Sequence, residues 1–303
     1  MNFITKDLDR GNSSLTVVFG WLAVFCSAFF FYLATVIIRW AEPHTDIETS
    51  YFVFARFLLG FIVVCVFLLI RRERVKPRNY HYLVGRTVAN SVAVFCFYKA
   101  VEVGTVAEAN ILNMTYPLFV ALFSWFVLKK QRDYVAMIVV VIAFVGIYLV
   151  LSPAAVDSRS GSWWGICSGI TAAAAMIYLN VSRRHHDSQT ILFFMFGLGS
   201  LLMFILFRGA IYWPDADTFF YLFICSAAGV LGQYLLTYGF LFVTAVEGSI
   251  ISSSRVLMAA IMGPVLVGDP ALTAVGWLGA LLIFSSNSMI ALRKQPVKTE
   301  GSK

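Results

Sequence analysis

A polar stripe containing one arginine runs through an apolar segment in the second half of the chain. Its members recur every three or four residues, which places them on one face of a helix. They are Gly248, Ser252, Arg255 and Ala259. The small residues are also explained by packing, but a guanidinium in an apolar segment favours recognition of a carboxylate or phosphate, which arginine binds through paired hydrogen bonds. We therefore predict that Arg255 and Ser252 bind a small molecule carrying such a group.

A matching stripe in the first half of the chain has the same order of small, polar, large and small residues. It consists of Ala109, Asn113, Tyr116 and Val120. Pro117 follows Tyr116 directly, and a proline within a helix kinks it and frees the carbonyl one turn earlier, near Asn113. We expect Asn113 and Tyr116 to belong to the same binding site and Pro117 to assist movement of the helix.

Two further apolar segments add hydrogen-bonding side chains. Asn90 lies in one, and Gln233, Tyr234 and Tyr238 lie in the other. Such groups bond either to a neighbouring helix or to a ligand, and we assign these four residues to the candidate binding site. Arg86 lies near the start of its segment, so it either extends to the polar boundary or serves as a gate.

Glu108 and Glu247 hold corresponding positions in the two halves, within the similar sequences Thr105–Glu108 and Thr244–Glu247. A carboxylate in the first turn of a helix is stabilised by the helix dipole, which is one explanation for the pair. The other is that they gate the site or couple it to a proton or another ion. Both explanations stay open at this stage.

The composition places these segments in a lipid bilayer. Of the 303 residues, 60% are hydrophobic and 13% are charged, whereas soluble domains are about 45–50% apolar and about 25% charged. No soluble fold of this length buries so much apolar surface, which excludes a soluble enzyme, a disordered chain and a disulfide scaffold. The basic residues form short clusters between apolar segments, so the net charge of +7 indicates membrane orientation rather than nucleic-acid binding.

Ten apolar segments of roughly 20 residues are long enough to span a membrane. They cover residues 15–38, 48–70, 80–99, 105–128, 134–151, 162–181, 190–208, 217–241, 245–267 and 271–292. If the spans alternate in direction, most Lys and Arg residues between them fall on the side of the N-terminus, which predicts that both termini are cytoplasmic. The expected fold is an all-α, multi-pass protein of the inner or plasma membrane.

The spans divide into two five-helix repeats, residues 15–151 and 162–292, with cytoplasmic tails at 1–14 and 293–303. An odd number of spans in each repeat forces the second copy to lie inverted relative to the first. Inverted repeats with a binding site at their interface are typical of secondary transporters. The organisation of the chain therefore favours transport.

Three motifs, in order, resemble the EamA-type members of the drug/metabolite transporter superfamily. They are Phe54-Ala-Arg56-Phe57-Leu58, Tyr116-Pro117-Leu118-Phe119 and Val267-Gly268-Asp269-Pro270. The resemblance implies a ten-helix carrier with alternating access and a central cavity lined by spans 1 to 4 and 6 to 9. Spans 5 and 10 would be peripheral, and Arg56 is expected to lie off the cavity. The sequence departs from the family pattern at Lys129-Lys130 and at Val256.

These observations favour a secondary transporter for a small polar metabolite. An amino acid or another carboxylate-bearing compound is the first choice, with export preferred. The alternative is uptake of a vitamin, a nucleotide-like cofactor or S-adenosylmethionine, and the distant alternatives are a non-transporting receptor and an ion channel. No catalytic set of an intramembrane enzyme is present.

No cofactor or metal is expected, because the four histidines lie in loops or at span ends and the five cysteines lack metal-ligand spacing. Gly161, Gly165 and Gly169 have the spacing of closely packed helices and leave a homodimer seam open. The expected partners are therefore the bilayer, the small-molecule substrate and a second copy of the chain.

Overall fold

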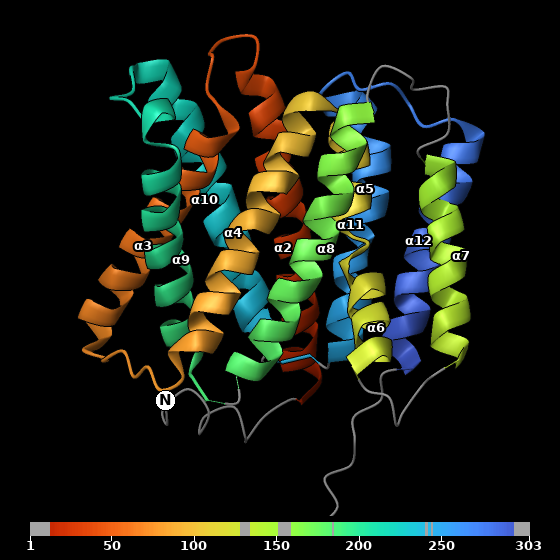
Figure 1. Ribbon diagram of the computed structural model, residues 1–303, viewed down its shortest axis with the longest axis horizontal. Helices are drawn as coiled ribbons and strands as arrows, with labels where there is room; N and C mark the ends of the chain where they lie inside the picture. Colours follow the sequence, from red (N-terminus) through yellow and green to blue (C-terminus); the bar gives the residue numbers. More distant parts are fainter. Residues whose placement is uncertain are drawn as a thin grey trace, which may run out of the picture.

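The computed structural model describes residues 13–127, 134–150, 159–183, 185–239, 242–243 and 245–293. All regular structure in these residues is helical, as Figure 1 shows. The α-helices are α2 (Ser13–Ala41), α3 (Thr49–Arg71), α4 (Tyr80–Val103), α5 (Val106–Asn113), α6 (Tyr116–Val127), α7 (Tyr134–Val150), α8 (Arg159–Ser182), α9 (Ser188–Leu206), α10 (Ala216–Gly239), α11 (Ala245–Leu266) and α12 (Ala274–Arg293). A short 3₁₀ turn, η2 (Arg208–Ala210), follows α9.

The expected spans coincide with helices, except that the fourth is divided. It was predicted as one kinked helix over 105–128, but α5 ends at Asn113 and α6 begins at Tyr116. Pro117 has no N–H to donate to the carbonyl of Asn113, so the helical hydrogen-bond ladder stops at this point. The proline therefore contributes to a full interruption instead of a kink.

Side chains near the interruption satisfy its backbone groups. The hydroxyl of Thr115 donates to the carbonyl of Leu112 (2.6 Å), a local bond that competes with helical bonding. The carbonyl of Met114 accepts a hydrogen bond from Nδ2 of Asn287 in α12 (2.8 Å). Unpaired backbone groups are costly inside a membrane, so Asn287 stabilises the break.

We predict that Asn287→Leu lowers the thermal stability of the purified protein. The substitution removes the donor to the Met114 carbonyl, and such interhelical bonds contribute about 1–2 kcal/mol in membranes. The melting temperature should fall measurably in a fluorescence melt. Ser288→Ala is the matched control, because among the described residues the Ser288 hydroxyl bonds only to the carbonyl of Phe284 one turn away. Equal melting temperatures for the two variants would contradict this role.

The outer surface of the helical bundle is apolar. Five described stretches are long and apolar enough to cross a membrane, namely Thr16–Ala41, Thr49–Arg71, Val106–Phe123, Ser188–Leu206 and Ala216–Gly239. Shorter apolar helices lie within α7, α8, α11 and α12. More than half of the Ile138 and Leu278 side chains is exposed. A surface covered by such residues suits contact with lipid.

The two halves of the chain pack against each other instead of forming separate bundles. α2 lies along α10, and α4 lies along α8. α3 packs on α9, α5 on α11, and α7 on α12. The α7–α12 pair stands at one edge in Figure 1, where a Cβ on Gly279 would lie only 2.5 Å from the carbonyl oxygen of Gly146. Every contact named here joins the first half to the second, so any site between the halves draws residues from both.

The glycine stripe of α8 faces the interior of this chain. A Cβ on Gly165 would lie 2.6 Å from the side chain of Leu112, and one on Gly169 would lie 2.6 Å from Oγ1 of Thr115. These two glycines let α8 approach the end of α5. These contacts agree with the prediction that the glycines allow close helix packing, and the homodimer stays a prediction.

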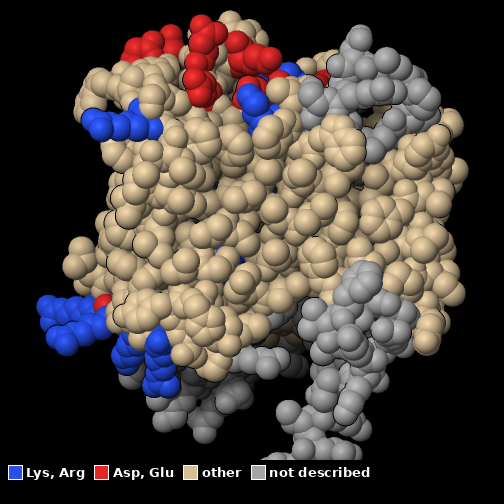
Figure 2. All heavy atoms as spheres, in the orientation of Figure 1, with Lys and Arg blue, Asp and Glu red and all other residues tan. Residues whose placement is uncertain are grey.

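Charged side chains gather at the two ends of the bundle and differ in sign, as Figure 2 shows. The acid-rich end, beside the α2–α3 loop, includes Glu42, Asp46, Glu48, Glu102, Asp215 and Asp217. The base-rich end, beside the α3–α4 loop, includes Arg71, Arg72, Arg74, Lys76, Arg78 and Arg183. This asymmetry is of the kind that orients proteins in membranes.

Candidate functional site

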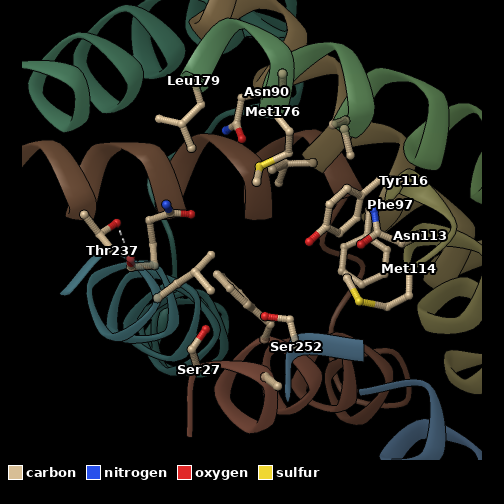
Figure 3. Close-up of a pocket in the computed structure, with 18 of the residues that line it drawn as sticks. Ser27, Asn90, Phe97, Asn113, Met114, Tyr116, Met176, Leu179, Thr237 and Ser252 are labelled. Carbon is tan, nitrogen blue, oxygen red and sulfur yellow. Dashed lines mark hydrogen bonds between the residues drawn. The ribbon is translucent and has the colours of Figure 1, made fainter. Parts of the chain in front are cut away.

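A cavity lies between the two halves, bordered by α2, α4, α8, α10, α11 and the break between α5 and α6 (Figure 3). Its water-accessible volume is about 150 Å³, and one water molecule requires about 10–15 Å³ of such volume. The space suits several waters or a small metabolite. Its polar wall consists of Ser27, Arg56, Arg86, Asn90, Asn113, Tyr116, Arg183, Gln233, Thr237, Ser252 and Arg255.

Arg255 is fixed beside the α5–α6 break. Its side chain is 4% exposed, and its Nη2 donates to Oδ1 of Asn113. The guanidinium also lies 5.2 Å from the centre of the Phe97 ring. Asn113 in turn donates to Oγ of Ser168 (3.1 Å), which orients the asparagine oxygen toward Arg255. The Nε of Arg255 has no hydrogen-bond partner among the described residues, so the guanidinium is positioned but incompletely satisfied.

Arg56 also belongs to the cavity wall, contrary to the expectation that it would lie off the cavity. Its Nη1 donates to the hydroxyl of Tyr98 (2.9 Å) and its Nη2 to the carbonyl of Gly229 (3.5 Å). A Cβ on Gly229 would lie 2.7 Å from Nε of Arg56. Because Gly229 has no side chain, Arg56 can extend from α3 against α10 and reach the cavity.

Arg86 is buried in the wall without a polar partner. Its side chain is 5% exposed, which argues against the alternative in which it extends to the polar boundary. Its guanidinium makes no hydrogen bond or ion pair with the residues that the structure describes. A buried, unpaired charge is strongly unfavourable, so Arg86 is a strong candidate for contact with an anion.

Four more residues assigned to the site from the sequence line the same cavity: Asn90, Tyr116, Gln233 and Ser252. The hydroxyl of Tyr116 points toward the open space in Figure 3. Oγ of Ser252 is buried and has no partner among the described residues. The structure thus brings the arginine stripe of α11 together with the end of α5, as the two matching stripes predict.

Tyr234 and Tyr238 do not line the cavity, in contrast to the sequence-based assignment. Their rings stack on each other with centroids 6.2 Å apart, and Nε2 of Gln189 donates to the hydroxyl of Tyr238 (2.9 Å). Successive residues of a helix are about 100° apart. The face of α10 that turns Gln233 and Thr237 to the cavity therefore turns the two tyrosines away.

Of the residues predicted to gate or couple transport, Arg86 lines the cavity, whereas Glu108 and Pro117 are not part of the described wall. Glu108 is 9% exposed in the first turn of α5, and its N–H is capped by Oγ1 of Thr105 (3.1 Å). Pro117 is the second residue of α6. The backbone of Glu247 lies in the first turn of α11, but its side chain is outside the described residues. This arrangement supports the helix-end explanation for Glu108 and leaves its coupling role a prediction.

A carboxylate joins the two halves at the acid-rich end. Oδ2 of Asp269, in the loop after α11, accepts hydrogen bonds from the backbone N–H groups of Val106 (2.6 Å) and Ala107 (3.4 Å) at the start of α5. Burial raises the pKa of the Asp269 carboxyl, and the Val106 hydrogen bond opposes this shift. Asn113 is the one described residue that α5 contributes to the cavity wall. The Asp269 junction therefore lies apart from the cavity, toward the acid-rich end.

The family resemblance implied that spans 1 and 6, which are α2 and α8, line the cavity, but the sequence singled out none of their residues for the site. Ser27 and Phe31 of α2, and Met176 and Leu179 of α8, all line the cavity. They lie in uninterrupted apolar stretches with no motif or charge to mark them. Arg183 could have been noticed in the sequence as a basic residue at the end of a span. Basic residues at that position are also explained by membrane orientation, so the site was not indicated.

We predict that Tyr234→Phe leaves substrate affinity and maximal transport rate within about 2-fold of the wild type. The Tyr234 hydroxyl is buried without a hydrogen-bond partner among the described residues and lies off the cavity, so its removal breaks no contact to substrate. Initial rates over a range of substrate concentrations would test this. A large rise in KM would show that Tyr234 belongs to the site after all. Tyr116→Phe is the comparison, because it removes a tyrosine hydroxyl that faces the cavity.

The comparisons with known proteins agree with this architecture. The profile of the EamA-like transporter family matches residues 18–152 and 159–292. The chain is 26% identical to an uncharacterized transporter of Helicobacter pylori, covering 91% of this chain and 96% of the relative. It is 24% identical to human solute carrier family 35 member G1, covering 88% and 77% of the two chains.

Two further similarities are more distant. The Pseudomonas aeruginosa pseudopaline exporter CntI is 24% identical over 58% of this chain and 62% of its own length. A solved structure with 17% identity has a TM-score of 0.61 and covers 91% of this chain and 99% of that chain, which shows the fold alone. The relatives are transporters rather than enzymes, and the chain belongs to the EamA-like transporter family of multi-pass membrane proteins.

Proposed function

We propose that this protein is a secondary carrier for a small organic compound that bears a carboxylate, such as an amino acid or an organic acid. The observation that carries the proposal is the charge of the cavity. Arg56, Arg86 and Arg255 are each no more than 6% exposed, and no acidic residue is present in the described wall. Buried cations without acidic partners favour an anionic ligand. They disfavour a cationic drug.

The carrier contains ten spans in two inverted five-helix repeats, residues 15–151 and 162–292. If each helix is replaced by its counterpart in the other half, the α2–α10 contact becomes the α8–α4 contact. The α3–α9 and α7–α12 contacts each map onto themselves. The separate family matches to 18–152 and 159–292 support the same division. Two repeats of this kind create a site at their interface near the middle of the membrane.

The base-rich end and both termini are cytoplasmic, following the excess of Lys and Arg at that end. Arg183, which lines the cavity, lies at this end, whereas the Asp269 junction lies at the other. The described conformation is therefore open toward the cytoplasm and closed outside. Transport proceeds by alternating access, with rocking of the halves around the cavity and energy from a proton or other ion gradient. Export is the preferred direction, supported by the relative named as an exporter.

Counterflow in proteoliposomes tests this proposal. Purified protein is reconstituted with an unlabelled pool of amino acids and organic acids inside, and accumulation of labelled amino acids, organic acids and cationic compounds is measured in turn. We expect saturable exchange of carboxylate-bearing compounds and none of cations. Exchange restricted to cations would overturn the proposal. Binding without exchange would identify a receptor.

Thiol labelling tests the orientation independently of the substrate. In a background without the five native cysteines, Lys76→Cys in the α3–α4 loop should be protected from an impermeant reagent in intact cells. Asp46→Cys in the α2–α3 loop should be labelled. The reverse pattern would place the base-rich end outside.

A further inference from the structure

The three buried arginines of the cavity differ in how they are satisfied. Arg56 donates to a hydroxyl and a carbonyl, and Arg255 donates to the Asn113 side chain. Arg86 has neither kind of partner in the described chain, although its exposure of 5% is comparable to theirs. Since a guanidinium carries five N–H donors, Arg86 presents a full set of unused donors at the wall of the cavity.

A second cation reinforces Arg86. Arg183, directly after α8, lines the same cavity and an adjoining smaller pocket together with Arg86. The two guanidinium groups interact electrostatically and repel each other. None of the described residues that line either space is acidic. Arg183 is exposed at the mouth of the cavity, so a ligand that enters there meets a second positive charge beside the buried Arg86, and an opposite charge on that ligand is favoured by both.

The Arg86–Arg183 pair lies at a different depth from Arg255. α4 and α11 both begin at the base-rich end, because their other ends meet the Asp269 junction and the acid-rich loops. The Phe97 ring of α4 lies 5.2 Å from the Arg255 guanidinium, and Phe97 follows Arg86 by eleven residues, about 16 Å along the helix axis. The Arg255 guanidinium therefore lies deeper in the cavity than Arg86, and Asn90 and Gln233 also belong to the wall.

We infer that Arg86 and Arg183 form a second anion-binding point at the cytoplasmic mouth, and that the substrate is an organic dianion with one anionic group on this pair and the other on Arg255. This inference rests on the proposed function and narrows its substrate class. The second group is a carboxylate or a phosphate ester, since guanidinium groups bind both through paired hydrogen bonds. Asn90 and Gln233 would contact the polar linker between the two groups.

Binding measurements with matched ligands test the inference. Calorimetry on protein in nanodiscs would compare dicarboxylates from malonate to adipate with monocarboxylates of the same chain length, and 3-phosphoglycerate would serve as the phosphate arm. For the wild type we expect at least one dianion to bind at least 10-fold more tightly than its matched monoanion. Arg86→Gln should weaken dianion binding at least 10-fold more than monoanion binding, which abolishes this preference. Arg86→Lys should retain part of it, because the charge remains.

Matched variants show whether Arg86 acts at a second anion-binding point or only adds to the overall positive charge of this end of the protein. They also distinguish failure of this inference from failure of the carrier proposal. Arg71→Gln removes an exposed charge at the same end of the protein and should leave the preference intact. Arg255→Gln should weaken both kinds of ligand. The second anion-binding point would be overturned if Arg86→Gln weakened monoanion and dianion binding equally. It would also be overturned if Arg71→Gln reduced the dianion preference as much as Arg86→Gln does. A wild type that binds both kinds equally would overturn it while sparing the carrier proposal, whereas binding of neither would overturn both.

Discussion

Arg255→Gln is expected to lower kcat/KM for a carboxylate-bearing substrate by about 100-fold. Hydrogen bonds to charged groups contribute about 1.5–3 kcal/mol, and each 1.4 kcal/mol corresponds to about tenfold. Arg255 is 4% exposed and is held by Asn113 and Phe97, so little water can replace it. Initial rates of substrate entry into proteoliposomes would measure the loss.

Two comparisons identify the cause of that loss. Arg255→Lys keeps the charge but not the planar fork, so it should fall between the wild type and Arg255→Gln. Arg208→Gln removes an arginine from the 3₁₀ turn after α9, away from the cavity, and should transport normally. Near-normal transport by Arg255→Gln, with an unchanged melting temperature, would show that Arg255 does not contact the substrate.

Asp269→Ala is expected to increase access to the cavity from the acid-rich side about 10-fold. The substitution leaves the N–H groups of Val106 and Ala107 without their acceptor, and loss of a helix N-cap costs about 0.5–2 kcal/mol. That energy is lost only in the conformation that holds the junction, so the open conformation becomes more populated. Ser27→Cys in a cysteine-free background reports the change through its rate of labelling by an impermeant reagent.

Asp215→Ala is the matched control, because Asp215 also caps a helix start, through the N–H of Thr218 (3.2 Å), but on α10 alone. It should not alter labelling of the reporter. If Asp269→Ala leaves the labelling rate unchanged, the junction does not hold the acid-rich end closed.

The same junction predicts a pH dependence. Burial raises the pKa of Asp269 in the closed conformation, whereas a carboxyl that reaches water in the open one titrates near its usual value of about 3.9. The closed conformation therefore binds the proton more tightly and is favoured as the pH falls through the raised pKa. Arg39 lowers and Glu42 raises this pKa. After division by the labelling rate of a fully exposed cysteine at each pH, which removes the loss of thiolate, labelling of the reporter should slow between neutral pH and about pH 4 with Asp269 present but not in Asp269→Asn.

The sequence alone predicted the helices and the position of Arg255 on a polar stripe of its helix, and the structure places that residue at the cavity. Length and hydropathy determine whether a segment can cross a membrane, so the expected spans match the observed helices except at the fourth. The local spacing around Arg255 placed Ser252 on the same face because helical periodicity is a property of neighbouring residues. Asn113 and Tyr116 followed from the resemblance of the two stripes.

The tertiary structure decided which side chains share the cavity. Gln233 and Tyr234 are adjacent in the sequence, yet only Gln233 lines it, because the rotation of α10 is fixed by packing against α2 and α3. Arg56 reaches the cavity only because Gly229, far away in the sequence, leaves it space. Periodicity defines the face of a helix but not the direction in which that face points. That direction depends on contacts between helices, which no single segment encodes.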